Sequence, residues 1–458
     1  MAGFTLAEIL EATGGHLLQR GISEYCSRIS TDTRSLEKGA LFIPLTGENF
    51  NGHRFINKAV EKGAVAVLIS EPADVSAFAA VSVIAVENTL HALEALARFH
   101  RLRFSIPVIA VTGSNGKTTT KDMISSVLKR KYRVCHTKKN FNNEIGLSQT
   151  LLSLTSEDEV CVTEMGMRGL GQIEELCHVA CPTIGVVTNV GTSHIGILGS
   201  RENIARAKGE LIEALPETGT AILNADDDFV CRMADHFGGK SLFYGIHRGR
   251  DVWADAIEAK PDAMNFHMQA LGECASIHLP MLGIHNVYDA LAAAAAGRLL
   301  DISADEISKA LAEFVPQGDS QKLEKLDGIL VLNDAYNANP LSVDMAFRAL
   351  RQLPGKRHIV VLGDMLELGA YAEQLHREIG KKAAENQFDF MITVGPLARI
   401  MAESARQNGL SDVKSFDDCQ AAEVYLKQKV VPGDTVLIKG SHAMHMEKIL
   451  DLWKGAAE

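Results

Sequence analysis

The chain has 458 residues, of which 46% are hydrophobic and 22% are charged, proportions that exclude a disordered or fibrous protein. The formal net charge of −11 argues against a broad nucleic-acid-binding face, so an anionic ligand would need a local cationic pocket. A length of roughly three times 150 residues predicts about three domains.

Residues 1–105 are predicted to form a small α/β domain. Helical spacing of apolar residues begins at Leu6, and a helix is expected from Thr89 to about Arg103. Short apolar runs predict strands at 40–45, 64–70 and 81–86. The N-terminus lacks the basic start of a signal peptide, and no stretch reaches the roughly 20 apolar residues of a membrane span. We therefore expect a cytoplasmic protein without a membrane insertion.

A second domain is predicted for residues 106–315 and a third for residues 316–458. Each contains continuous apolar runs, typical of strands buried on both faces, with helical stretches between them. The runs lie at 106–111, 159–165, 183–189 and 220–226, and then at 328–334, 358–364, 390–395 and 435–440. The alternation predicts an α/β fold with a doubly wound parallel sheet in the central domain and a Rossmann-like sheet in the C-terminal domain.

The eight cysteines are too few for a disulfide framework, and we expect reduced thiols. Cys177 and Cys181 flank His178, but a zinc site would need a second pair of ligands, which the sequence does not offer.

The segment VIAVTGSNGKTTTKDM, residues 108–123, has the layout of a phosphate-binding loop: a buried strand, a glycine-containing turn and a helix start. Backbone N–H groups and the helix N-terminus attract anionic oxygens, Lys117 can reach the β- and γ-phosphates, and the Thr118 hydroxyl can bind Mg²⁺. The usual pattern has a further glycine where this chain has Val111, so the loop is a variant. The alternative is a glycine turn in an ordinary strand-to-helix connection. The candidate nucleotide-binding residues are Gly113, Ser114, Asn115, Gly116, Lys117, Thr118 and Thr119.

Polar residues follow the neighbouring predicted strands, and in an open α/β sheet ligands bind beyond the carboxyl ends of the strands. Glu164 ends one run, Asn189 ends the next, and His194 follows in a loop. Glu164 could share a Mg²⁺ with Thr118, and His194 could hold a second. Taken singly, Glu164 could cap a helix and His194 could be solvated. Lys208 lies in a helical stretch and by itself reads as a surface lysine.

Further candidates lie near the start of an alanine-rich helix and at strand ends of the third domain. His285 and Asn286 could face a base or ribose, although Asn286 could instead be an N-cap. In the third domain, the segments 333–340, 363–369 and 439–444 are polar strand ends that suggest a second substrate face.

These motifs together resemble the Mur ligase family. TGSNGKTTT, TEMG, NVGTSHIG, AKGE, GIHN and DAYNANP occur in the order found in that family, and residues 30–64 resemble its uridine-nucleotide-binding domain. YNANP combined with GDMLELG resembles the member that joins D-alanyl-D-alanine to UDP-N-acetylmuramoyl-tripeptide in peptidoglycan synthesis.

The resemblance implies a role for each candidate. Lys117 and the loop amides would hold ATP. Thr118 and Glu164 would bind one Mg²⁺. His194 and a carbamylated Lys208 would bind a second Mg²⁺. Asn286 would contact adenine, and Asp334 would reach the nucleotide from the C-terminal domain. Two groups of residues would bind the substrates: Ser30, Thr33, Arg34, Gly47 and His53 for the uridine diphosphate, and Asn142, Asn143, Tyr336, Asn337 and Asn339 for the peptide parts.

Two positions depart from the family pattern. Lys322 stands where relatives usually have an arginine, which keeps the charge but loses the bidentate fork. His442 replaces another arginine, so its charge depends on pH.

The sequence leaves two alternative functions open: a ligase of the same chemistry for another amino acid, such as a diamino acid, and a nucleotide-binding scaffold without turnover. We expect a monomer that binds no nucleic acid. Whether the third residue of the accepted peptide is lysine or diaminopimelate is not evident.

Overall fold

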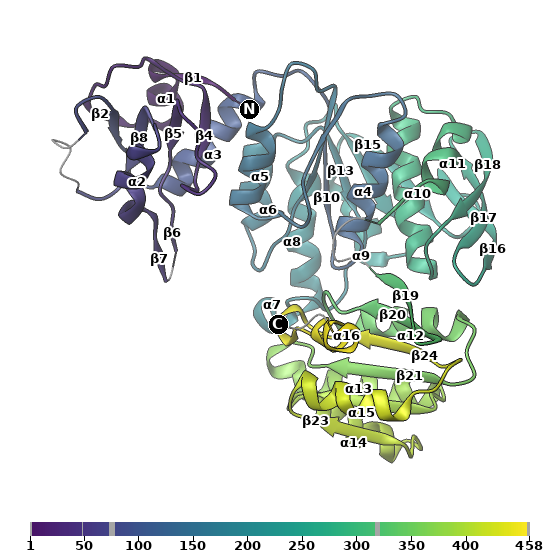
Figure 1. Ribbon diagram of the computed structural model, residues 1–458. Helices are drawn as coiled ribbons and strands as arrows, with labels where there is room; N and C mark the ends of the chain where they lie inside the picture. The colour runs from purple at the N-terminus through teal and green to yellow at the C-terminus, as the bar shows by residue number, and fades with distance from the viewer. Residues whose placement is uncertain (1, 48, 73–77, 317–320, 456–458) are drawn as a thin grey trace.

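The computed structural model describes residues 2–47, 49–72, 78–316 and 321–455. Within these residues the chain forms three α/β units, each built on its own sheet (Figure 1). The predicted α/β fold with three sheets is confirmed, while the exact domain limits at 105 and 315 stay a prediction. No helix of the described residues is long and apolar enough to span a membrane.

The N-terminal unit contains a five-stranded sheet in the order β2-β9-β8-β5-β4, in which only the β2–β9 pair is antiparallel. Its strands are β2 (His16–Gln19), β4 (Arg28–Ser30), β5 (Ala40–Phe42), β8 (Ala66–Ile69) and β9 (Ser82–Ala85). Two short antiparallel pairs lie outside this sheet. The first pair is β1 (Phe4–Thr5) with β3 (Tyr25–Cys26), and the second is β6 (Thr46–Gly47) with β7 (Phe50–Asn51). Its helices are α1 (Leu6–Thr13), α2 (Ile56–Glu61) and α3 (Thr89–Arg101), preceded at α2 by the 3₁₀ helix η1 (Gly52–Phe55).

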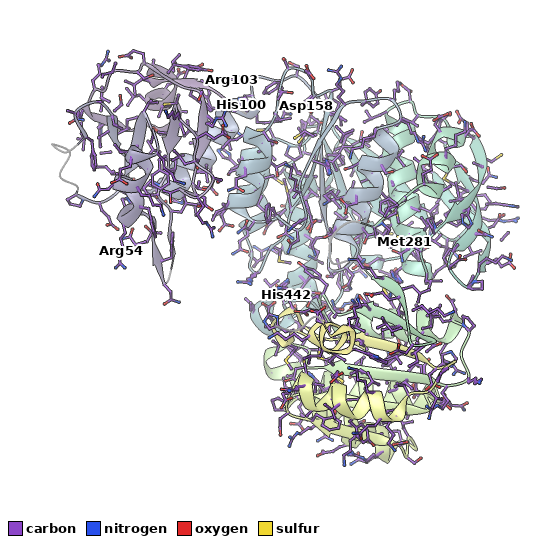
Figure 2. The ribbon with its side chains drawn as sticks, viewed as in Figure 1. Arg54, His100, Arg103, Asp158, Met281 and His442 are labelled. Carbon is purple, nitrogen blue, oxygen red and sulfur yellow. The ribbon has the colours of Figure 1, made fainter. Side chains whose placement is uncertain are left out.

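Helix α3 joins this unit to the central one. The Arg101 guanidinium donates to the carbonyl oxygens of Ala180 and Cys181, and the His100 ring contacts the Leu154 carbonyl oxygen at 3.0 Å. Figure 2 shows His100 and Arg103 at this junction, near the top of the view.

The central unit is built on a nine-stranded sheet in the order β11-β12-β10-β13-β14-β15-β16-β17-β18. The first seven strands run parallel, and β17 and β18 are added antiparallel. The strands are β10 (Val108–Thr112), β11 (Val134–His136), β12 (Val160–Glu164), β13 (Ile184–Val187), β14 (Thr220–Asn224), β15 (Lys240–Gly245), β16 (Val252–Ala259), β17 (Met264–Ala270) and β18 (Glu273–Leu279). The sequence analysis predicted β10, β12, β13 and β14 and made no prediction for β11 or for β15 to β18.

Helices cover both faces of this sheet. They are α4 (Lys117–Leu128), α5 (Glu144–Leu152), α6 (Gln172–Ala180), α7 (Ile195–Leu198), α8 (Arg201–Glu213), α9 (Asp228–Cys231), α10 (Ile284–Leu299) and α11 (Ala304–Ala312), with the 3₁₀ helix η3 (Arg232–His236). Alternate residues of β10 point to opposite faces: Ile109 and Val111 pack in the core with α4 and α10, while Val108 and Ala110 pack in the core with α5 and α8. This explains why the run is continuously apolar.

The C-terminal unit has a six-stranded sheet in the order β19-β20-β24-β21-β22-β23, parallel except for β19. Its strands are β19 (Lys322–Leu326), β20 (Ile329–Asp334), β21 (His358–Gly363), β22 (Phe390–Val394), β23 (Val413–Phe416) and β24 (Thr435–Lys439). Its helices are α12 (Pro340–Gln352), α13 (Ala372–Glu385), α14 (Ala398–Gln407), α15 (Cys419–Lys429) and α16 (Lys448–Lys454), with 3₁₀ helices η4 (Gly369–Tyr371) and η5 (His442–Met444). This unit lies below the central one in Figure 1.

Candidate active site

A cavity of 1860 Å³ lies at the carboxyl ends of the central strands, and the C-terminal unit forms its other wall. Its central side includes the phosphate-loop segment, Glu164, His194 and Lys208, and its C-terminal side includes Asp334 and His442. Figure 2 shows Met281 and His442, two lining residues, on the central and C-terminal units. The structure therefore brings together residues that the sequence placed at separate strand ends.

The loop between β10 and α4 is held in place by the end of β13. The Ser114 N–H donates to the Asn189 carbonyl oxygen, the Asn115 N–H donates to the Asn189 side chain at 3.0 Å, and the Thr188 hydroxyl donates to the Asn115 carbonyl oxygen. A Cβ on Gly113, whose φ is +152°, would lie 1.8 Å from the Thr188 hydroxyl oxygen. Hydrogen bonds within the protein thus hold the loop in shape, and glycine is required at 113.

The Lys117 ammonium donates to the carbonyl oxygens of Gly113 at 2.9 Å and Ser114 at 3.4 Å, so it folds back over the loop. Burial lowers the pKa of Lys117, and the nearby Glu164 carboxylate acts in the opposite direction. Thr118 and Thr119 follow in the first turn of α4 and also line the cavity. A lysine held by carbonyl oxygens can move to a phosphate, because an anionic oxygen is the stronger acceptor.

Glu164, at the end of β12, is only 1% exposed. Its Oε1 accepts a hydrogen bond from the Asn142 side-chain amide at 2.8 Å, and its buried Oε2 has no hydrogen-bond partner among the described residues. Burying a carboxylate oxygen without a partner is costly, so this atom is suited to a cation. The neighbouring Asn143 caps α5 by accepting from the Gly146 N–H, and it lines the cavity.

His194 lies where the central and C-terminal units touch. Its Nδ1 is 2.8 Å from Oε2 of Glu367, and the Gly196 N–H donates to the Glu367 carbonyl oxygen. Burial lowers the pKa of His194, Glu367 opposes this, and Lys117 and Lys208 lower the pKa further. Glu367 belongs to the GDMLELG segment that the sequence analysis noted, but its contact with His194 had no signal in the sequence.

Lys208, on α8, is 2% exposed, so the surface-lysine alternative is wrong. Burial lowers the pKa of Lys208 well below its usual value, and the Lys117 charge adds to this. No carboxylate in the described part of the chain offsets these two effects. Lys208 is therefore suited to the neutral amine form, which can react as a nucleophile.

In the described ranges, no three His, Cys, Asp or Glu side chains are grouped so that they could hold a metal ion by themselves. This also leaves the Cys177–Cys181 zinc alternative without support, and all eight cysteines are free thiols. Mg²⁺ still fits the cavity, because proteins often bind it through one or two carboxylates together with substrate phosphates. The unpartnered oxygen of Glu164 and the hydroxyl of Thr118 are groups of that kind.

Asn286 is buried in the first turn of α10, and the N-cap of this helix is Gly283, so the N-cap alternative is wrong. Its side-chain amide donates to the Leu282 carbonyl oxygen at 2.7 Å. Across the cavity, Asp334 forms a 2.7 Å ion pair with the buried Lys439. Both Asn286 and Asp334 line the cavity, as the assignment to a nucleotide requires.

The YNANP segment supplies contacts from the C-terminal unit to the central one. The Asn339 amide donates to the Asn115 side chain at 2.6 Å and to the Ser193 hydroxyl at 3.0 Å, while Asn339 also caps α12. Tyr336 contacts Asn140 and packs against the His442 ring. Asn337 is exposed, and its carbonyl oxygen accepts from Lys439. Asn339 therefore links the two units by hydrogen bonds and is also a candidate substrate contact.

The five candidates of the N-terminal unit, and Lys322 of β19, are not among the residues that line this cavity. Ser30 and Thr33 lie at and after the end of β4, and Arg34 is exposed and paired with Asp32 at 2.7 Å. Gly47 has open space around it, and both ring nitrogens of His53 contact neighbours, Asn51 and the Ser70 N–H. The structure gathers these residues on one unit but not at the phosphate loop.

Comparisons with known proteins cover nearly the whole chain. Family models match for "Mur ligase family, catalytic domain" over residues 26–101, "Mur ligase middle domain" over 111–297 and "Mur ligase, glutamate ligase domain" over 320–442. The UDP-N-acetylmuramoyl-tripeptide–D-alanyl-D-alanine ligase of Bacillus subtilis is 38% identical over 429 residues, which cover 92% of each chain.

Solved structures of related ligases have the same fold as this chain. A crystal structure of MurF from Acinetobacter baumannii superposes with a TM-score of 0.92 at 31% identity, covering 99% of both chains. The MurF ligase of Thermotoga maritima in complex with ADP has a TM-score of 0.84 at 27% identity, covering 94% of this chain and 97% of the other.

Proposed function

The chain belongs to the Mur ligase family, and we propose that it joins D-alanyl-D-alanine to the C-terminal carboxylate of UDP-N-acetylmuramoyl-tripeptide, with conversion of ATP to ADP and phosphate. The choice of substrates rests on the near-complete coverage of relatives that carry this name. The reaction belongs to peptidoglycan precursor synthesis, which we place in the cytoplasm.

The observation that carries the proposal is one shared cavity. It contains a phosphate loop, a buried carboxylate with an unpartnered oxygen and a buried lysine without a counterion. A scaffold that only binds nucleotide has no use for the last two groups, because each costs folding free energy. Catalytic sites keep such groups when the reaction needs them.

ATP solves a chemical problem in this reaction. A carboxylate does not condense with an amine near neutral pH, because it is a poor electrophile without a good leaving group. The tripeptide carboxylate attacks the γ-phosphorus of ATP, which gives an acyl phosphate and ADP. The free amine of D-alanyl-D-alanine attacks the acyl carbon, and the tetrahedral intermediate releases phosphate and leaves the amide.

In this scheme the Lys117 ammonium leaves its carbonyl acceptors and stabilises the charge of the transferring phosphoryl group. The amides of the loop from Gly113 to Thr119 orient the triphosphate. Asn142 holds the Glu164 carboxylate in place, and the C-terminal unit limits the access of water, which would hydrolyse an acyl phosphate.

We propose two places for Mg²⁺ in this arrangement. Thr118 and Glu164 would hold one ion, and His194 with Lys208 would hold a second. Bound Mg²⁺ would supply charge neutralisation between the two anionic substrates. The protein residues orient the substrates, and the Glu367 carboxylate lies 2.8 Å from the His194 ring.

Lys208 can serve a cation only after its charge is reversed. A neutral amine adds to CO₂ and loses one proton, which gives a carbamate with an anionic oxygen pair. The burial of Lys208 favours the neutral amine that this addition needs. Lys208→Ala should lose ligation, and a small carboxylic acid such as formate should restore part of it. Full activity of Lys208→Ala would contradict this role.

The substrates are assigned to different units. Asn286 and Asp334 are assigned to the nucleotide, and Asn142 and Asn143 to the muramoyl peptide. Tyr336, Asn337 and Asn339 are assigned to the incoming dipeptide. The uridine diphosphate is assigned to Ser30, Thr33, Arg34, Gly47 and His53 of the N-terminal unit.

Phosphate release measured with ATP and Mg²⁺ tests the proposal. It should require both UDP-N-acetylmuramoyl-tripeptide and D-alanyl-D-alanine. Phosphate release with a diamino acid and the UDP-N-acetylmuramoyl-dipeptide would instead assign the alternative ligase activity. Nucleotide binding without turnover in any combination would leave the scaffold function.

A further inference from the structure

Asp226 follows β14 and lines the same cavity as the phosphate loop. Its Oδ2 accepts hydrogen bonds from the Ile246 N–H at 2.8 Å and from the Tyr288 hydroxyl at 3.1 Å. Its own N–H donates to the Asn224 side chain. Two hydrogen bonds to Oδ2 therefore fix the orientation of this carboxylate, and the third contact holds its backbone.

The other oxygen of Asp226 is not used within the described structure. Oδ1 is buried without a hydrogen-bond partner, and the side chain is only 9% exposed. The nearest cationic atoms belong to Arg250 at 3.9 Å and His247 at 4.0 Å, beyond hydrogen-bond distance. A rigid, unpartnered acceptor in a cavity wall indicates a donor on a ligand.

The position of Asp226 fits the nucleoside end of ATP. β14 lies two strands from β10 in the sheet, so its carboxyl end is roughly 10 Å from the phosphate loop. Helix α10 connects the two places. Asp289 accepts from the Thr120 hydroxyl beside the loop, and the preceding Tyr288 donates to Asp226. Glu164 lies on β12, on the other side of β10, where the reacting phosphate must be.

His285 supplies a complementary donor on the same helix. The Asn286 amide nitrogen is identified by its bond to the Leu282 carbonyl oxygen, and it also lies 3.1 Å from His285 Nε2. Nε2 therefore accepts, and the neutral ring carries its proton on Nδ1, which is buried without a partner. Burial lowers the pKa of His285 to about 4, so the ring is neutral near pH 7. His285 and Tyr288 are three residues apart, on the same side of α10.

We propose that Asp226 is a specificity-determining residue for the base of the nucleotide, and that its free Oδ1 accepts a hydrogen bond from the exocyclic amine of adenine. Adenine offers this amine beside a ring nitrogen that can accept from His285. Guanine and hypoxanthine have a carbonyl oxygen in place of the amine, which would face a carboxylate with no donor between them. The inference deepens the proposed function, because it requires that the cavity binds ATP.

The test compares the binding of ADP and IDP, with Mg²⁺, by calorimetry. The wild type should bind ADP about 10- to 100-fold more tightly than IDP, the usual size of a hydrogen bond to a charged group. Asp226→Asn should remove or reverse this preference, because the amide nitrogen can turn toward the base and donate to the IDP carbonyl. Asp228→Asn, two residues further along and exposed, should keep the wild-type preference.

Three results would overturn the proposal. They are equal binding of ADP and IDP by the wild type, an unchanged preference in Asp226→Asn, and an effect of Asp226→Asn on ADP binding that is absent with 2′-deoxy-ADP, which would place the acceptor at the ribose. Failure of the proposed function shows in a separate assay, because phosphate release with both substrates would then be absent whatever the preference between ADP and IDP. Equal binding of ADP and IDP by the wild type would overturn the proposal even if Asp226→Asn does not fold.

Discussion

Replacing Lys208 by methionine should stabilise the fold while abolishing ligation. The lysine is 2% exposed and has no counterion among the described residues, and methionine has a similar length without the amine. Burial of an amine without a counterion costs about 1–3 kcal/mol, so the free energy of unfolding of Lys208→Met should rise by about this amount at pH 7.

The effect should depend on pH in a defined way. The folded pKa of Lys208 lies well below the unfolded value of about 10.4. Between the two values the unfolded chain binds more protons than the folded one, so the wild type gains stability as the pH rises. The advantage of Lys208→Met should therefore shrink as the pH approaches about 10.

Urea unfolding of both proteins from pH 7 to 10, in buffer depleted of CO₂ to prevent carbamate formation, measures this difference. Lys381→Met on α13 is the matched control, because Lys381 is 61% exposed and its replacement should change stability by less than about 0.5 kcal/mol. A Lys208→Met protein less stable than the wild type, or an advantage that does not vary with pH, would refute the reasoning.

Three further predictions concern the loop and its contacts. Lys117→Ala should lower kcat/KM for phosphate release by about 10³-fold or more by removing charge stabilisation, and near-normal turnover would contradict the phosphate-loop assignment. Gly113→Ala should weaken ADP binding in calorimetry, because the new Cβ would lie 1.8 Å from the Thr188 hydroxyl oxygen; unchanged affinity would show that the loop can shift freely. Asn339→Ala should destabilise the protein by about 1–2 kcal/mol in urea unfolding through the lost N-cap, whereas Asn339→Asp should keep the cap but lose the donation to Asn115.

Much of the fold was predictable because buried strands leave a strong pattern. The run before the phosphate loop is buried throughout from Val108 to Thr112, as its continuous apolar character indicates. The helix start at Lys117 was also predicted correctly, because glycine and the following polar residues mark it. In contrast, β17 has an alternating pattern with Met264, Phe266 and Met268 buried, a signal that the sequence analysis did not use.

The sequence could not supply contacts between distant segments. Glu367 beside His194, and Asn339 beside Asn115, join units whose separation in the chain hides any pairing. Lys208 looks like an ordinary helix lysine in its local sequence, and only the packing of α8 shows that it is buried. Asp226 was not singled out, because its unpartnered oxygen depends on Tyr288 and Ile246, which orient the other oxygen.

The sequence by itself determined the chemistry that each strand end carries, because a glycine turn, a lysine and a carboxylate act through local properties of residue type and spacing. Only the tertiary structure decided which of these groups share one cavity and which are buried. Burial and distance depend on how helices and domains pack, and they set the protonation of Lys208 and the unpartnered oxygens of Glu164 and Asp226. Local sequence does not encode these quantities, since each arises from residues far apart in the chain.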